Sequence, residues 1–153
     1  MISSQTLQFY RLFAHQSAEM LAKIANLAEE KEVDAGYQLF FEGEVAKSFY
    51  LIHDGSVVLT MNMGEKGDKR VEELEPIGKG EVAGWSSMIE PHIYKLGAYT
   101  GQKSHLILFD GEKLLALFDE NPAYGYYFMK KLAEVIGDRL ISKCVQIMSL
   151  MEG

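Results

Sequence analysis

Residues 35–57 read AGYQLFFEGEVAKSFYLIHDGSV, and this stretch decides the fold. Short runs of Tyr, Phe, Leu, Ile and Val alternate in it with Gly and Asp, as in short strands joined by tight turns. Asp54-Gly55, between SFYLIH and SVVLT, is the strongest hairpin signal in the chain, because both residue types suit a two-residue β-turn. The stretch therefore predicts a hairpin with its turn at Asp54-Gly55.

Further strand-like segments follow on the C-terminal side at similar spacing. They read KRVEELEPIGKGE, YKLGAYTG and SHLILFD. Short strands at such regular spacing are typical of a compact all-β sandwich or barrel. We expect this β-segment to span residues 33–110.

Helical patterns flank the β-segment on both sides. In residues 1–32, the run SAEMLAKIANLAEE places apolar residues on one helical face, and Ser17 is a suitable N-cap. In residues 111–153, Asp110 caps a first helix, and Pro122 starts a second because proline suits the first helical turn. The 153 residues thus fit one domain of N-terminal helices, strands and C-terminal helices.

The last helix would run about 30 residues, or about 45 Å, which exceeds the length that a small β-domain can cover. Its apolar stripe consists of Leu132, Ile136, Leu140, Cys144, Ile147 and Met151. We expect the far end of this stripe to contact the same helix of a second chain, giving a homodimer. A helix folded back on its own domain is the alternative.

Composition excludes several classes of protein. Apolar residues make up 48% and charged residues 24% of the chain, which are the values of a globular protein rather than a disordered one. A formal net charge of −7 argues against a nucleic-acid-binding surface, which needs clustered Lys and Arg. The single cysteine allows no internal disulfide, and neither a signal peptide nor a membrane-length apolar segment is present. We expect a cytoplasmic protein that does not associate with membranes.

The order of helices, Gly-rich strands and a long helix, together with residues 35–57, resembles the cyclic-nucleotide-binding domain of the catabolite activator protein (Crp/Fnr-type) family of bacterial regulators. The stretch FEGE at 41–44 matches a tight turn of that family, and the match continues through IGKGEVAGW, SHLILFD and ENPAYGYYFMKKLAEVIGDRL. The resemblance covers about residues 7–150. It implies a mainly β fold with flanking helices: a cupin-like β-roll (double-stranded jelly roll), N-terminal helices and a long C-terminal dimerisation helix.

The resemblance also implies a phosphate-binding cassette, formed here by Gly80 and Glu81 with Val82, Ala83 and Gly84 after them. By resemblance, Glu81 would accept a hydrogen bond from a ribose 2′-hydroxyl. The backbone N–H groups of the three following residues would face the cyclic phosphate of cyclic AMP or cyclic GMP. Such a monoanion suits backbone amides at a positive dipole end. From the residues alone, a Gly-rich corner with a solvated glutamate is the alternative.

The sequence departs from the family at one charged position. Members that bind cyclic nucleotides usually carry an arginine near the start of the next strand. That position and the two after it are Leu96, Gly97 and Ala98. Lys95 precedes them, but neighbouring residues on a strand point to opposite faces, so Lys95 would serve only if the cassette were shifted by one residue. We therefore expect a degenerate cassette whose ligand is a cyclic nucleotide, another small anion, or absent.

The long helix contributes a second set of candidates. In regulators of this type, polar residues on this helix touch the purine, and the corresponding neighbourhood here is Arg139, Lys143 and Cys144. The alternative for Arg139 is a surface pair with the neighbouring Asp138, which would contribute little energy.

Enzyme chemistry has no support in the sequence. No two of the four histidines have the close HxH spacing of metal ligands on one strand. No motif places a histidine–acid pair beside a nucleophile, and no Walker loop is present. We expect no enzyme activity and no bound metal.

Two functions are left open. The first is a stand-alone small-ligand sensor or regulatory domain that signals through its dimer or through a protein partner. The second is a ligand-free homodimerising interaction module derived from the same fold. An open pocket beside Glu81 would favour the first, and a pocket filled by Leu96, Trp85 or Met88 would favour the second. No helix-turn-helix follows the long helix in this sequence, so direct DNA binding is not expected.

Overall fold

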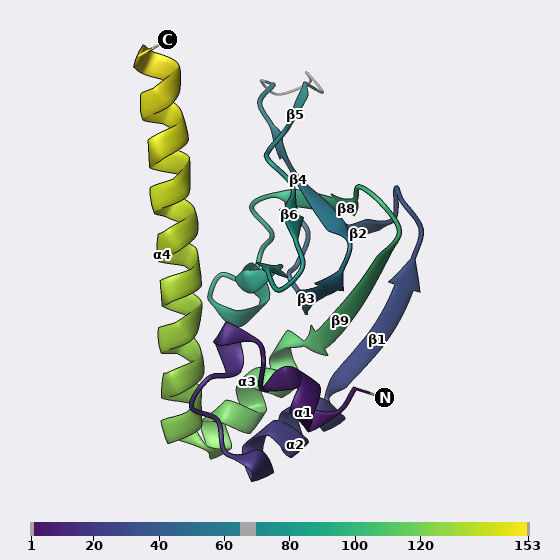
Figure 1. The fold of residues 1–153 in the computed structure, drawn as a ribbon, viewed down its shortest axis with the longest axis vertical. Helices are drawn as coiled ribbons and strands as arrows, with labels where there is room; N and C mark the ends of the chain where they lie inside the picture. Colours follow the sequence, from purple (N-terminus) through teal and green to yellow (C-terminus); the bar gives the residue numbers. More distant parts are fainter. Residues whose placement is uncertain (1, 65–69, 153) are drawn as a thin grey trace.

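The computed structural model describes residues 2–64 and 70–152 and shows two antiparallel sheets flanked by helices (Figure 1). The N-terminal elements are α1 (Ser4–Leu7), the 3-10 helix η1 (Arg11–Phe13) and α2 (Ala18–Asn26). The strands are β1 (Ala28–Val33), β2 (Gln38–Phe40), β3 (Ser48–Asp54), β4 (Ser56–Asn62), β5 (Val71–Glu73), β6 (Ile77–Gly78), β7 (Val82–Ala83), β8 (Gly97–Thr100) and β9 (Ser104–Asp110). The remaining elements are the 3-10 helix η2 (Trp85–Met88), α3 (Gly111–Glu120) and α4 (Pro122–Glu152).

The two sheets face each other across an apolar core. One sheet has the strand order β1-β9-β3-β7, and the other has the order β2-β8-β4-β5 with β6 also pairing with β4. The core between them contains buried side chains from both sheets: Phe40, Tyr50, Ile52, Val57 and Leu106. This arrangement confirms the mainly β fold with flanking helices that the sequence predicts.

The turn at Asp54-Gly55 joins the two sheets, so the hairpin predicted there is wrong. β3 pairs with β7 and β9, whereas β4 pairs with β5, β6 and β8. Ser104 packs closely against this corner, because a Cβ at Gly55 would lie 2.2 Å from the Ser104 Oγ. Gly55, with a φ of 109°, therefore allows the turn to approach the start of β9 closely and does not form a two-residue hairpin.

The first strand begins earlier than the sequence predicts. Helices were expected throughout residues 1–32, whereas α2 ends at Asn26 and β1 pairs along its whole length with β9. Pairing with an interior strand overrides the helical pattern of this segment, because local propensity is a weak preference. The predicted N-caps are confirmed: side-chain oxygens of Ser17 and Asp110 each accept a backbone N–H three residues ahead at 3.0 Å.

A second core lies between the helices and the β1-β9-β3-β7 sheet. Its centre is a group of four rings, with centroid distances of 5.8 to 6.3 Å between contacting pairs and at most 1% exposure each: Phe13, Phe49, Phe109 and Phe128. Because Phe128 belongs to α4, this cluster fixes the first part of the long helix against the sheet.

α4 is a single helix of 31 residues, about 47 Å long, that runs along one side of the molecule (Figure 1). Leu132 is buried, but beyond Arg139 the apolar side chains are 56–81% exposed. These exposed residues are Leu140, Ile141, Val145, Ile147, Met148, Leu150 and Met151. Contact of this surface with a second chain stays a prediction. In residues 2–64 and 70–152, no helix has both the length and the apolar character needed to cross a bilayer.

Candidate functional site

The turn between β6 and β7 presents the carboxylate of Glu81. Gly80 adopts a φ of 86°, and its N–H donates to the carbonyl oxygen of Ile52 at 2.8 Å, which fixes the turn against β3. Glu81 Oε2 accepts the N–H of Gly78 at 2.8 Å. The other carboxylate oxygen, Oε1, makes no hydrogen bond or ion pair within the described part of the chain. An exposed carboxylate is thus held in place with one oxygen available to a hydroxyl donor.

The backbone after Glu81 is fixed by strand pairing and by one glycine. Val82 and Ala83 pair with β3, and their side chains are buried in the two separate cores. Gly84 adopts a φ of 78°, and a Cβ at this position would lie 2.6 Å from the carbonyl oxygen of Ser48. A ligand beside residues 82–84 would therefore meet mainly backbone atoms.

A cavity of about 440 Å³ separates this turn from α4, which is a volume typical of small-molecule sites. The predicted site residues that line it are Gly80, Glu81, Val82, Arg139 and Lys143. Its apolar wall includes Leu51, Leu59, Ile77 and Val135. The structure thus places Glu81 and a second carboxylate from the β-roll, two cations from the long helix and apolar side chains around one space.

A second hollow, of only about 30 Å³, lies beside the start of η2. The residues lining it include Ala83, Gly84, Trp85, Lys95, Leu96 and Arg139. Leu96 stands where the resemblance places an arginine, and its partly buried side chain packs against the core between the sheets. The side chains of Leu96 and Trp85 therefore close this corner, while the larger cavity beside Glu81 is open.

Gly97 and Ala98 lie away from both spaces in the described structure. Ala98 is completely buried between the two sheets. A Cβ at Gly97 would lie 2.5 Å from the Oγ1 of Thr60, so this glycine permits close packing of β8 against β4. The structure does not bring these two predicted residues to the cavity.

Arg139 reaches from α4 to the backbone of β7. Its Nη2 donates to the carbonyl oxygen of Val82 at 2.8 Å, and the residue borders both the cavity and the small hollow. Burial lowers the pKa of the Arg139 guanidinium, and the Glu81 carboxylate opposes this shift. No other acceptor for this guanidinium is present among the described residues. Arg139 is therefore a partly desolvated cation with several N–H donors unused.

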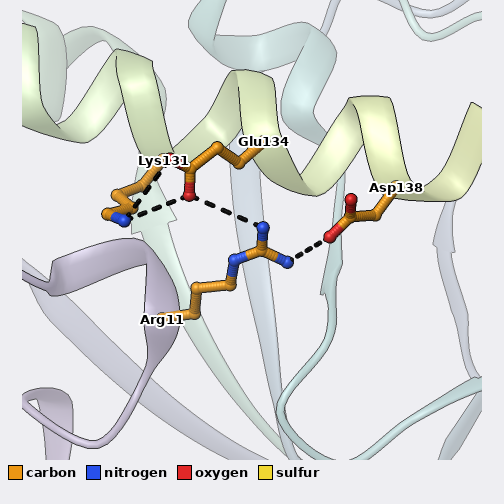
Figure 2. A network of polar contacts seen from close by, with 4 residues as sticks. All are labelled: Arg11, Lys131, Glu134 and Asp138. Atoms are coloured by element: carbon orange, nitrogen blue, oxygen red, sulfur yellow. Dashed lines mark hydrogen bonds and ion pairs between the residues drawn. The ribbon is translucent and has the colours of Figure 1, made fainter.

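Arg11 holds the middle of α4 against the N-terminal segment, a contact that sequence reasoning missed (Figure 2). Its Nη1 lies 2.5 Å from Asp138 Oδ2, and its Nη2 lies 3.5 Å from Glu134 Oε2. Glu134 also accepts from Lys131 at 3.1 Å. The surface pair of Asp138 with Arg139 that the sequence left open is absent, because Asp138 pairs with Arg11 instead.

Glu75 contacts α4 at another part of the cavity wall and was also missed. It lies between β5 and β6, and its Oε2 accepts a hydrogen bond from the Nε2 of Gln146. The same oxygen lies 3.8 Å from the Nζ of Lys143, which donates to the Oε1 of Gln146 at 3.4 Å. Glu75 is far from α4 in sequence, so no local pattern predicts this group.

Side chains suited to metal binding are dispersed. Within residues 2–64 and 70–152, no cluster of three or more His, Cys, Asp or Glu side chains is placed to hold a metal ion. The side chains that line the cavity are carboxylates, cations and apolar groups, among them Glu81, Arg139 and Leu51.

Comparisons with known proteins agree with the observed fold. The model of the family described as the cyclic nucleotide-binding domain matches residues 30–121. A candidate potassium channel protein of Rhodopseudomonas palustris is 24% identical over 128 residues, which are 84% of this chain but only 29% of that protein. A candidate cyclic nucleotide-binding protein of Geobacter metallireducens, known as a crystal structure, has a TM-score of 0.81 and 28% identity, covering 92% of this chain and 99% of that one. The Thermus thermophilus catabolite activator protein has a TM-score of 0.70 at 20% identity, covering 92% of this chain and 63% of that one.

Proposed function

The chain belongs to the cyclic nucleotide-binding domain family, and on that premise we propose that it is a non-enzymatic sensor domain for a cyclic nucleotide or a similar small phosphate monoanion. One observation carries the proposal: Glu81 and Arg139 line the same open cavity. The carboxylate can accept a ribose hydroxyl, and the guanidinium can bind the phosphate.

The charge that balances the phosphate comes from α4 in this proposal. Leu96 supplies no charge at the strand position, whereas Arg139 is partly buried and has unused donors. A partly buried guanidinium with unused N–H donors is stabilised when an anion binds to it. Each charge-assisted hydrogen bond contributes roughly 1.5–3 kcal/mol to the free energy of binding. The cassette is therefore degenerate at Leu96 and compensated at Arg139.

This position of the cation couples the ligand to the long helix. A phosphate that takes the Arg139 donors competes with the Val82 carbonyl oxygen, to which Arg139 donates at 2.8 Å. Arg11 pairs with Asp138, the residue before Arg139, so a shift of this helix turn would strain that contact. We expect the signal to leave through the exposed apolar end of α4, either in a homodimer or to a protein partner.

The second candidate is a homodimerising interaction module without a ligand. The hollow beside Leu96 holds only about 30 Å³, which favours a cassette that packing has closed. The exposed apolar end of α4 suits both candidates, because either one needs a partner to cover it. The cavity of about 440 Å³ favours the sensor.

Thermal unfolding in the presence of nucleotide separates the two candidates. Binding to the folded state alone stabilises by about 2.7 kcal/mol at a hundredfold excess over Kd. For a domain of this size, that corresponds to a rise in Tm of roughly 5–10 °C. We expect cyclic AMP or cyclic GMP to produce a saturating rise that Glu81→Gln removes and Glu120→Gln preserves, since Glu120 ends α3 outside the cavity. No rise with either nucleotide at millimolar concentration would contradict the sensor.

A further inference from the structure

A second hollow of small-molecule size, the N-terminal hollow, adjoins the cavity beside Glu81 and has a volume of about 450 Å³. The residues that line it are Thr6, Phe9, Tyr10, Arg11, His53, Lys79 and Gly80. Three of them, Tyr10, Arg11 and Gly80, also line the cavity. The other four line the N-terminal hollow and not the cavity, so a ligand bound here can be distinguished from a ligand bound beside Glu81.

Aromatic side chains form one wall of the N-terminal hollow. Phe9 is 83% exposed, belongs to neither core, and has no ring contact within the described part of the chain. The next residue, Tyr10, is buried, and its hydroxyl lies 2.6 Å from the Nδ1 of His53. This hydrogen bond fixes the rings of Tyr10 and His53, whose centroids are 6.3 Å apart. The fold thus leaves an uncovered phenyl ring beside two fixed rings, and a ligand with an aromatic ring would remove that apolar surface from water.

The charged groups around the N-terminal hollow are basic. None of the described residues that line it is Asp or Glu, although the chain carries 22 acidic and 15 basic residues. Arg11 already forms ion pairs with two carboxylates of α4. Lys79 is exposed and makes no hydrogen bond or ion pair within residues 2–64 and 70–152. A neutral His53 whose Nδ1 accepts from Tyr10 carries its hydrogen on Nε2, which is a further donor. A carboxylate is therefore the ligand group that complements this lining.

We propose that the N-terminal hollow is a second binding site, which takes a small aromatic carboxylate of the arylacetate type. The carboxylate lies beside Lys79, and the aromatic ring packs against Phe9. The ring contact supplies most of the affinity, and Lys79 selects the sign of the charge. This site is separate from the proposed nucleotide site, because it uses neither Glu81 nor Arg139.

NMR titrations that follow the backbone amides of Thr6, Phe9, His53 and Lys79 test the proposal with three probes. Phenylacetate should give saturating shifts at these amides. Phenethylamine, which has the same ring with the opposite charge, should bind at least about fivefold more weakly, because attraction to Lys79 becomes repulsion. Cyclohexylacetate keeps the carboxylate but has no π face, so it should bind at least about twofold more weakly than phenylacetate.

Two variants with matched controls separate the roles of charge and ring. Lys79→Gln should raise the Kd for phenylacetate about threefold to fivefold, whereas Lys103→Gln, an exposed lysine outside the hollow, should leave it unchanged. Phe9→Ala should raise that Kd about threefold to tenfold without loss of folding, because the ring is 83% exposed. Phe41→Ala removes another ring, 60% exposed and outside the hollow, and should bind phenylacetate as wild type does.

The contrary outcomes each overturn a stated part of the proposal. Phenethylamine or cyclohexylacetate binding as tightly as phenylacetate would overturn the class of ligand. Equal losses of affinity in Lys79→Gln and Lys103→Gln, or in Phe9→Ala and Phe41→Ala, would overturn the roles of Lys79 and Phe9. Phenylacetate that gives no saturating shift at the four amides, or shifts centred on Val135 and Arg139 instead, would overturn the site itself and leave the sensor function standing.

Discussion

Replacing Arg139 by glutamine tests whether α4 supplies the positive charge of the site. The wild-type guanidinium donates to the carbonyl oxygen of Val82 at 2.8 Å and has no other acceptor among the described residues. Two charge-assisted hydrogen bonds to a phosphate would contribute about 3–6 kcal/mol. Release of the Val82 contact costs about 1 kcal/mol, and the open side of the cavity weakens the remainder by solvent screening. A net loss of about 2–3 kcal/mol remains, which raises Kd roughly 30- to 150-fold.

The stability of the ligand-free variant should respond differently from its affinity. Arg139→Gln removes the hydrogen bond to the Val82 carbonyl oxygen, which costs stability. It also removes a partly buried cation, whose charged form burial disfavours, as its lowered pKa shows. These effects oppose each other, so the free energy of unfolding should stay within about 1 kcal/mol of wild type. A residue that only supports the fold would instead lose stability and affinity together.

Calorimetry for Kd and urea unfolding for stability give the two readouts. Arg139→Lys should bind with intermediate affinity, because lysine keeps the charge but lacks the planar fork. Lys130→Gln, a substitution of an exposed cation on the same helix outside the cavity, should bind as wild type does. A Kd for Arg139→Gln within about threefold of wild type would refute the reasoning, as would an equal loss of affinity in Lys130→Gln.

Three further predictions concern the cassette, the attachment of α4 and its exposed end. Gly84→Ala should reduce the free energy of unfolding by about 1–3 kcal/mol in urea titrations. The new Cβ would lie 2.6 Å from the Ser48 carbonyl oxygen, and the residue would have to keep a φ of 78°. Unchanged stability would contradict the geometry of this turn. The pKa of Glu134 is lowered, chiefly by its hydrogen bond from Lys131, so its stabilising effect is complete above the ordinary pKa of 4.5 and is lost as the pH falls through the lowered value. The Tm difference between wild type and Glu134→Gln should therefore shrink on acidification, and a difference that grows would be inconsistent with this sign. Ile147→Asp should convert the expected homodimer into a monomer in sedimentation analysis, because Ile147 is 56% exposed on the apolar face of α4; a monomeric wild type would rule out the dimer.

The sequence predicted the features that depend on local signals. Side chains of Ser17 and Asp110 cap the helices that follow them, because an N-cap needs only an acceptor next to free N–H groups. The long helix was predictable from its apolar spacing and from Pro122. The family resemblance predicts Gly80 and Glu81 in a phosphate-binding cassette; both residues line the cavity, and their role in binding stays a prediction.

Features that depend on pairing between distant segments were not predictable from local patterns. Asp54-Gly55 has the composition of a hairpin turn, yet β4 pairs in the other sheet, and Ser104 from the distant β9 packs against this corner. The segment from Ala28 has a helical pattern and becomes a strand because β9 lies beside it. Local secondary-structure propensity does not depend on a neighbouring strand that is distant in the sequence.

The contacts at the candidate site that sequence reasoning missed also join distant parts of the chain. Arg139 donates to Val82, and Arg11 pairs with Asp138, across separations of 57 and 127 residues. Glu75 meets Gln146 across 71 residues. Such contacts follow from the packing of α4 against the β-roll. The sequence therefore shows which residue types are available but does not predict which of them contact each other.

Crystal structures of the protein with cyclic AMP and with cyclic GMP test the central claim most directly. We predict the phosphate within hydrogen-bonding distance of the Arg139 guanidinium and the ribose 2′-hydroxyl on the carboxylate of Glu81, in the cavity that both residues line. A nucleotide bound elsewhere, or a cavity that stays empty at saturating nucleotide, would contradict the account.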